Sequence, residues 1–165
     1  MPATYEPIAS TTLGSNAATV TFDNIPGTYT DLILVGRFGI QDGKLTEVYS
    51  RFNSDTGTNY SVTELWGNGS ATGSTRASNS NLGAFIGGSD ATATNVVLLH
   101  VFSYANTNVN KTTLSVSASP GRGVSRNVSL WRSTAAITRM DISRNFAAND
   151  IVAGSVWSLY GIKAA

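Results

Sequence analysis

The chain has 165 residues, the size of one ordinary domain, and is long enough to bury a hydrophobic core without disulfide or metal support. Charged residues make up only 13% of it, whereas Ser, Thr, Asn and Gly supply more than two residues in five. Eleven basic residues stand against ten acidic ones, and a formal net charge of +1 creates no field that would hold nucleic acid or an anionic membrane. We therefore expect neither as a partner.

Alternation of apolar and polar residues, rather than helical spacing, is the main pattern of the sequence. Residues 18–22, 114–118 and 124–131 alternate for much of their length, which predicts strands with one face on a core and the other face polar. Other runs of this character bring the number of expected strands to about ten. In chain order the expected strands cover about 5–12, 18–22, 30–39, 46–53, 60–66, 82–87, 94–104, 114–118, 124–131, 136–143 and 155–162.

Turn sequences rich in Gly, Pro, Asn and Asp separate these runs. Many short strands with regular turns are typical of an all-β fold, here an antiparallel β-sandwich that is jelly-roll-like. We expect one domain over 1–165, with a short N-terminal arm at about 1–8 and a long exposed loop at about 67–81, which is poor in apolar residues. The run Val96–Phe102 is apolar on both faces, so a loop or a neighbouring subunit should cover its second face.

Residue types that carry catalysis are scarce. The only histidine, His100, lies in an apolar strand with no acidic residue within eight positions, so we interpret it as structural. Cysteine is absent, and no phosphate- or dinucleotide-binding motif occurs. The ten carboxylates lie mostly at turns, although two of them could still meet in space. We expect no catalytic residue and no cofactor, and hence a protein that is not an enzyme.

One weak metal-binding pattern is present. Thr58 stands where a calcium loop needs Gly, only two carboxylates are offered, and a strand flanks the segment in place of helices. We interpret the segment as a polar turn and predict no metal site. The residues at the ligand positions of the pattern are Asn53, Asp55, Gly57, Asn59, Ser61 and Glu64.

Arginine outnumbers lysine eight to three, and several arginines lie among apolar and aromatic residues near the C-terminus. Arginine is favoured at protein interfaces because its rigid guanidinium donates several hydrogen bonds, whereas the alternative is a solvated outer face. Tryptophan and tyrosine are core or interface anchors more often than sugar-stacking residues. The predicted interface residues are Arg126, Trp131, Arg132 and Arg139.

Four segments resemble a family of small structural proteins of tailed bacteriophages, namely cement or decoration proteins, minor capsid proteins and tail-fibre-like proteins. They occur in order and together extend over most of the chain. The resemblance implies a β-sandwich, often of jelly-roll type and often trimeric, that sits on a virion. It supplies no catalytic residues. The segments are Phe22–Leu32 (FDNIPGTYTDL), Arg51–Ser61 (RFNSDTGTNYS), Gly67–Ser70 (GNGS) and Asn145–Ile162, which begins NFAA and ends GSVWSLYGI.

The expected function is therefore that of a virion structural protein, in the first place a capsid cement or decoration protein. Its expected partners are the major capsid protein and further copies of itself, as a homotrimer. The N-terminus lacks the basic and apolar segments of a secretion signal, so we expect synthesis in the host cytoplasm and a final location on the capsid surface. The alternative is a tail-fibre or receptor-binding module whose loop 67–81 and exposed aromatic rings contact host glycans. A carbohydrate-active enzyme on the same fold is a third, weaker reading.

Overall fold

The computed structural model describes residues 4–41, 46–89, 94–145 and 150–163. In these ranges the chain forms twelve strands, and none of it forms a helix long and apolar enough to cross a membrane. In chain order the strands are β1 (Tyr5–Thr12), β2 (Thr19–Phe22), β3 (Asp31–Phe38), β4 (Thr46–Phe52), β5 (Tyr60–Gly67), β6 (Thr72–Ser80), β7 (Ala84–Ser89), β8 (Asn95–Val101), β9 (Lys111–Ser119), β10 (Gly123–Trp131), β11 (Met140–Arg144) and β12 (Val156–Ile162).

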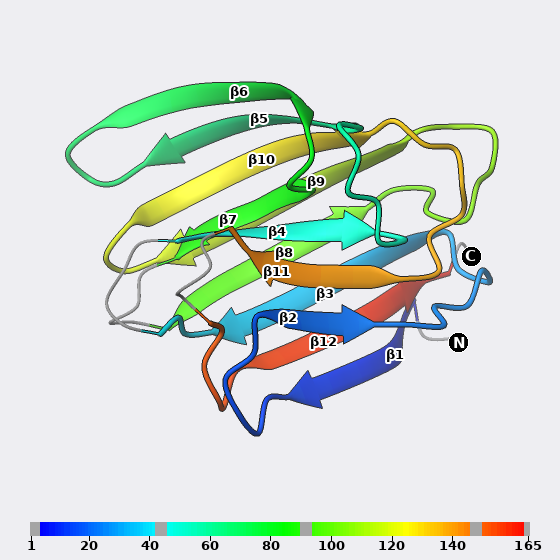
Figure 1. The fold of residues 1–165 in the computed structure, drawn as a ribbon, viewed down its shortest axis with the longest axis horizontal. Helices are drawn as coiled ribbons and strands as arrows, with labels where there is room; N and C mark the ends of the chain where they lie inside the picture. The colour runs from blue at the N-terminus through cyan, green and yellow to red at the C-terminus, as the bar shows by residue number, and fades with distance from the viewer. Residues whose placement is uncertain (1–3, 42–45, 90–93, 146–149, 164–165) are drawn as a thin grey trace.

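The strands form two antiparallel sheets that pack face to face (Figure 1). The large sheet has eight strands in the order β1-β12-β3-β8-β9-β10-β5-β6, and the small sheet has four in the order β2-β11-β4-β7. The chain passes repeatedly from one sheet to the other, as in a jelly roll. The fold is thus an all-β antiparallel sandwich of jelly-roll-like type, which confirms the predicted class.

Two segments differ from the sequence-based expectation. Residues 72–80, predicted as part of a long loop, form the exposed edge strand β6, which pairs with β5. Their Ser, Thr, Gly and Asn side chains carry no strand pattern, and backbone pairing with β5 alone makes the strand. The predicted N-terminal arm is likewise part of the sheet from Tyr5 onward, because β1 pairs with β12, while residues 1–3 lie outside the described ranges.

One continuous hydrophobic cluster fills the space between the two sheets. One of its two tryptophans, Trp157, is fully buried and stacks on Phe38 with ring centroids 5.0 Å apart. The indole ring of Trp157 lies directly over Gly36, where a Cβ would collide with the ring. Phe52, Tyr60 and Trp131 form a second aromatic group in the same cluster.

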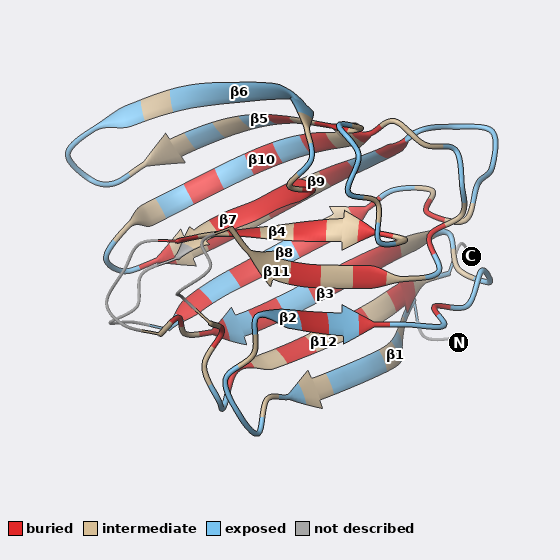
Figure 2. Ribbon diagram, viewed as in Figure 1, coloured by how far each residue is buried: buried red, intermediate tan, exposed pale blue. Residues whose placement is uncertain are grey.

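Strands β9 and β10 reverse the predicted orientation of their faces. Their serines point between the sheets and are buried, whereas their valines and leucines point outward, and Figure 2 shows β10 alternating between buried and exposed residues. The small hydroxyl side chains let β7 approach closely: Ser117 lies where a Cβ on Gly87 would be, and the Ser115 hydroxyl donates to the Phe85 carbonyl at 3.2 Å. The expectation of an apolar inner face is wrong for these two strands.

Candidate functional site

The outward-facing side of the large sheet carries an apolar surface. Strand pairing aligns its residues in rows, and the central row runs from Val35 through Leu98, Val116 and Arg126 to Leu65 across five strands. Val124 and Leu65 are each 61% exposed. We call this surface the outer face; its exposed large apolar residues are Val35, Leu65, Val96, Leu98, Val124 and Val128.

An apolar surface of this kind is unusual for a monomer. Soluble proteins scatter single apolar residues over their surface, whereas rows of them on adjacent strands mark a site of contact with another molecule. No described segment of the chain covers Val96 or Leu98, so the predicted cover of this face by a loop is not found in the described residues, and cover by a neighbouring subunit stays a prediction. Arg126 adds the charge and the donors that are common in protein interfaces.

His100 lies on the same side of the sheet and is paired with an acid that sequence spacing did not reveal. Its Nε2 is 2.9 Å from Oδ2 of Asp31, which reaches across from the neighbouring strand β3. The other oxygen of Asp31 accepts a hydrogen bond from the backbone N–H of Ser103 at 2.7 Å, and the imidazole stacks on Phe102. These contacts hold the edge of the outer face in one conformation, as expected for a structural histidine.

Of the predicted interface residues, Trp131 is a core residue. Its side chain is 3% exposed, its indole N–H donates to Oδ2 of Asp55 at 2.6 Å, and it packs on Phe52 and Tyr60. The interface prediction for Trp131 is therefore wrong, because the alternation of β10 turns this position inward and leaves no ring surface for a partner.

Arg132 is engaged within its own chain. Its guanidinium donates to Ser61 Oγ at 2.8 Å and to Asn79 Oδ1 at 2.7 Å, and so links the end of β10 to β5 and β6. Only Arg126, among the four predicted residues, lies exposed within the outer face. An interface role for Arg126 and Arg132 stays a prediction.

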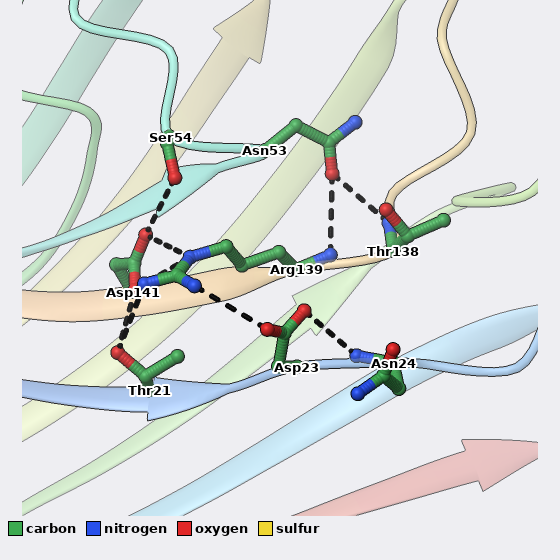
Figure 3. Close-up of polar contacts among 8 residues, drawn as sticks. All are labelled: Thr21, Asp23, Asn24, Asn53, Ser54, Thr138, Arg139 and Asp141. Atoms are coloured by element: carbon green, nitrogen blue, oxygen red, sulfur yellow. Dashed lines mark hydrogen bonds and ion pairs between the residues drawn. The ribbon is translucent and has the colours of Figure 1, made fainter.

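Arg139 is the centre of a polar network on the small sheet (Figure 3). It donates to both carboxylate oxygens of Asp141, at 2.9 Å from Nε and 2.8 Å from Nη2, and reaches Asp23 at 3.4 Å. Burial raises the pKa of Asp141, but hydrogen bonds from Arg139 and Thr21 outweigh it and leave that pKa below its ordinary value. This network joins β2 and β11, so the described contacts of Arg139 are intramolecular and its interface role also stays a prediction.

The calcium-like segment is a turn closed by its own side chains. Asp55 accepts hydrogen bonds from the backbone N–H of Gly57 at 2.8 Å and from Asn59 Nδ2 at 2.9 Å, in addition to the one from Trp131. Asn53, at φ +50°, accepts from the backbone N–H groups of Thr138 and Arg139. Within the described ranges, no group of three or more His, Asp or Glu side chains is placed to hold a metal ion.

A cleft of about 350 Å³ lies between the β5–β6 hairpin and the small sheet. Strand pairing places two rows of its lining residues side by side, Ser117–Ser125–Trp66 and Glu64–Thr75. Glu47 of β4 and Arg122 of the β9–β10 turn also line it, together with Asn68, Gly88, Gly123 and Val124. A second hollow of about 290 Å³ shares Glu47, Glu64 and Thr75 with it, so the two adjoin at these residues.

The cleft brings together two carboxylates that are 17 positions apart in sequence. The pKa of Glu64 lies above its ordinary value, chiefly because of burial and also because of the nearby charge of Glu47. The hydrogen bond from Thr75 and the charge of Arg122 lower this pKa but do not outweigh the rise. Glu47 is held in place by Tyr49, whose hydroxyl donates to Oε2 at 2.9 Å. Sequence reasoning left such a pair open but could not find it, because Glu47 and Glu64 belong to different sheets.

Two glycines leave room for the larger side chains of the cleft. A Cβ on Gly73 would lie 2.7 Å from Cζ2 of Trp66, so the indole packs against the bare backbone of β6. A Cβ on Gly88 would lie 2.6 Å from Nε of Arg122. The guanidinium therefore lies over Gly88 of β7, and its Nη1 donates to the carbonyl of Thr46 in the adjacent strand β4 at 3.1 Å. The arrangement offers a half-buried aromatic ring, two carboxylates and a guanidinium at one cleft.

The sequence matches no protein-family model and no curated protein. Among solved structures, the fold is similar to a variant of alginate lyase Aly36B in complex with alginate tetrasaccharide, with 12% identity, coverage of 94% of this chain and 80% of that one, and a TM-score of 0.37. It is also similar to galectin LEC-6 of Caenorhabditis elegans, with 8% identity, coverage of 94% and 96%, and a TM-score of 0.35. At TM-scores this low, neither likeness carries a conclusion about what this chain does.

Proposed function

We propose that this protein is a structural protein of a bacteriophage virion, in the first place a capsid cement or decoration protein. It attaches through its outer face to the major capsid protein and strengthens the contacts between capsid subunits. The resemblance of its four sequence segments to phage structural proteins supports the virion location.

The single observation that carries an attachment role is the outer face itself. Five adjacent strands present aligned apolar residues to the outside, while serines of β9 and β10 occupy the interior. Burying a Leu or Val side chain is worth about 1.5–3 kcal/mol, so a chain that exposes several of them gains from a partner that covers them. A homotrimer would multiply this gain, because three identical faces bind one lattice with avidity.

The test is co-sedimentation of the purified protein with capsids that lack it. Val128→Asp places a charge within the outer face, in the row next to Arg126, where the side chain is 50% exposed, and should weaken capsid binding by at least about tenfold. Val109→Asp is the matched control, because Val109 is 43% exposed in the loop before β9, outside the aligned rows. Equal binding of the two variants would contradict attachment through the outer face.

Antibody labelling of intact particles, viewed by electron microscopy, separates the main proposal from its alternative. Label over the whole head supports the cement reading. Label confined to the tail supports a tail-fibre or receptor-binding module and contradicts the capsid location. A non-enzymatic role belongs to the same proposal, and hydrolysis or elimination of a polysaccharide that is lost in Glu64→Gln would contradict it.

A further inference from the structure

The cleft lies on the opposite side of β5 from the outer face. Glu64 and Trp66 point toward the small sheet, whereas Leu65 between them points outward and is 61% exposed. Of the outer-face residues, Val124 alone also lines the cleft, so a ligand bound against Glu64 and Trp66 leaves the rest of the outer face free for a partner. Attachment to a capsid through the outer face thus leaves the cleft free to bind another ligand.

We propose that this cleft binds a neutral oligosaccharide. Ligand sites combine an apolar wall with a few convergent polar groups, and the cleft has both. The half-buried indole of Trp66 provides a flat apolar surface for the C–H face of a sugar ring, and the carboxylate oxygens of Glu64 and Glu47 accept hydrogen bonds from its hydroxyl groups.

Other lining residues, Arg122, Ser117 and Ser125, supply donors. Arg122 uses Nη1 on the Thr46 carbonyl, which orients the guanidinium and leaves further N–H groups on its cleft side. Ser117 and Ser125 are only 6% and 8% exposed, line the cleft, and are fixed by their mutual hydrogen bond of 2.9 Å. Fixed donors and acceptors reduce the conformational entropy that a bound ligand would have to remove.

Charge and length narrow the class of ligand. Two carboxylates and one guanidinium line the first cleft, so an anionic sugar bound beside Glu47 and Glu64 would add a third negative charge to a partly desolvated site, whereas Arg76 lines the second hollow. Neutral sugars avoid this repulsion. The second hollow adjoins the cleft at Glu64 and extends to Tyr49 and Leu82, so the proposed ligand is a chain with one sugar unit in the cleft and a further unit in the hollow.

The probes are cellotetraose, maltotetraose and chitotetraose, with tetragalacturonate as the anionic comparison. Binding is measured by tryptophan fluorescence and by saturation-transfer NMR. We expect at least one neutral tetrasaccharide to bind the full chain, and Trp66→Ala and the isosteric Glu64→Gln each to weaken it by at least about tenfold. Leu65→Ala is the matched control, because it changes the same strand on its opposite side and should leave sugar binding unchanged.

Three results would overturn the inference: no binding of any neutral tetrasaccharide at millimolar concentrations, binding that survives both cleft substitutions, or a preference for tetragalacturonate. The folding of each variant is checked by its far-UV circular dichroism. Capsid co-sedimentation of Glu64→Gln keeps the two proposals distinguishable, because this variant should lose the sugar and still bind capsids, whereas Val128→Asp should do the reverse.

Discussion

Replacing Trp131 by Phe should destabilise the protein by about 2.5 kcal/mol at neutral pH. The substitution removes the 2.6 Å hydrogen bond from the indole to Asp55, and a bond to a charged group is worth roughly 1.5–3 kcal/mol. We take the lower end, about 1.5 kcal/mol, because Asp55 is partly exposed and water can replace the lost donor. The smaller ring also leaves a cavity of roughly 40 Å³ in the core, which costs about 1 kcal/mol.

The pH dependence of this effect has a defined sign. Burial raises the pKa of Asp55, but hydrogen bonds from Trp131, Asn59 and Gly57 outweigh it and leave the pKa below its ordinary value. The stabilisation is therefore fully present above the pKa of about 3.9 that Asp has in an unfolded chain, and it is lost as the pH falls through the lower folded value. The effect of Trp131→Phe should shrink accordingly between pH 7 and strongly acidic solution.

The assay is urea unfolding followed by far-UV circular dichroism, at pH 7 and in acid, for the wild type, Trp131→Phe, Asp55→Ala and the double variant. The double-mutant cycle should give a coupling of about 1.5 kcal/mol at pH 7 and little in acid. A loss below about 0.5 kcal/mol for Trp131→Phe, or additive effects of the two substitutions at pH 7, would refute the assignment of Trp131 to a hydrogen-bonded core position.

The remaining predictions concern backbone conformation and buried polar contacts, and urea unfolding checks each of them. Gly123→Ala should lower the free energy of unfolding by more than about 2 kcal/mol, because φ is +102° and the new Cβ would meet the backbone at 67–68. Gly69→Ala, at φ +86° in open space, should lower it by about 1 kcal/mol, and similar losses for the two variants would contradict the steric reason. Lys111→Met should lower the free energy of unfolding by about 3 kcal/mol, because the fully buried ammonium donates to three backbone carbonyls at 2.7–3.0 Å. An unchanged free energy of unfolding would contradict this, because water would then satisfy the three carbonyls. Asn53→Ala should lower the free energy of unfolding by about 2 kcal/mol, because it removes the side-chain hydrogen bonds and disfavours the positive φ. Asn53→Gly should lower it somewhat less, because glycine tolerates this φ. Equal stability of Asn53→Ala and wild type would show that the hydrogen bonds contribute nothing.

Local patterning was enough to predict the fold class and eleven of the twelve strands. It failed at β6, where Thr72–Ser80 has no apolar alternation and is a strand only because β5 offers a free edge. It also failed for the direction of β9 and β10, since alternation indicates two faces but does not say which of them meets the other sheet. Hydrophobicity favours the apolar face inward, and here the close packing of β7, with Gly87 against Ser117, requires small side chains instead.

The candidate site was less predictable than the fold. Arg126 was singled out as an arginine among apolar and aromatic residues near the C-terminus; the structure places it exposed in the outer face, and its interface role stays a prediction. The cleft, by contrast, depends on the pairing of Glu64 with Thr75 and on the approach of Glu47 from the other sheet. Both are long-range contacts, and no local sequence signal marks them. Trp131 was misassigned for a related reason: only the packing of two sheets decides whether an aromatic residue at a strand end faces the core or a partner.

The serine-lined interior of β9 and β10 also bears on how this hairpin finds its register during folding. Because side chains alternate with a period of two, a slip of one residue against β8 and β5 would turn the valines inward and the serines outward. Hydrophobic burial alone favours the slipped pairing. The native register is fixed at the open end of the hairpin, where Lys111 at the start of β9 pairs with Trp131 at the end of β10. Each of these side chains donates hydrogen bonds to groups outside the hairpin. The hydrogen bonds of Lys111 and Trp131 thus favour the native register of the hairpin over one that is shifted by a single residue.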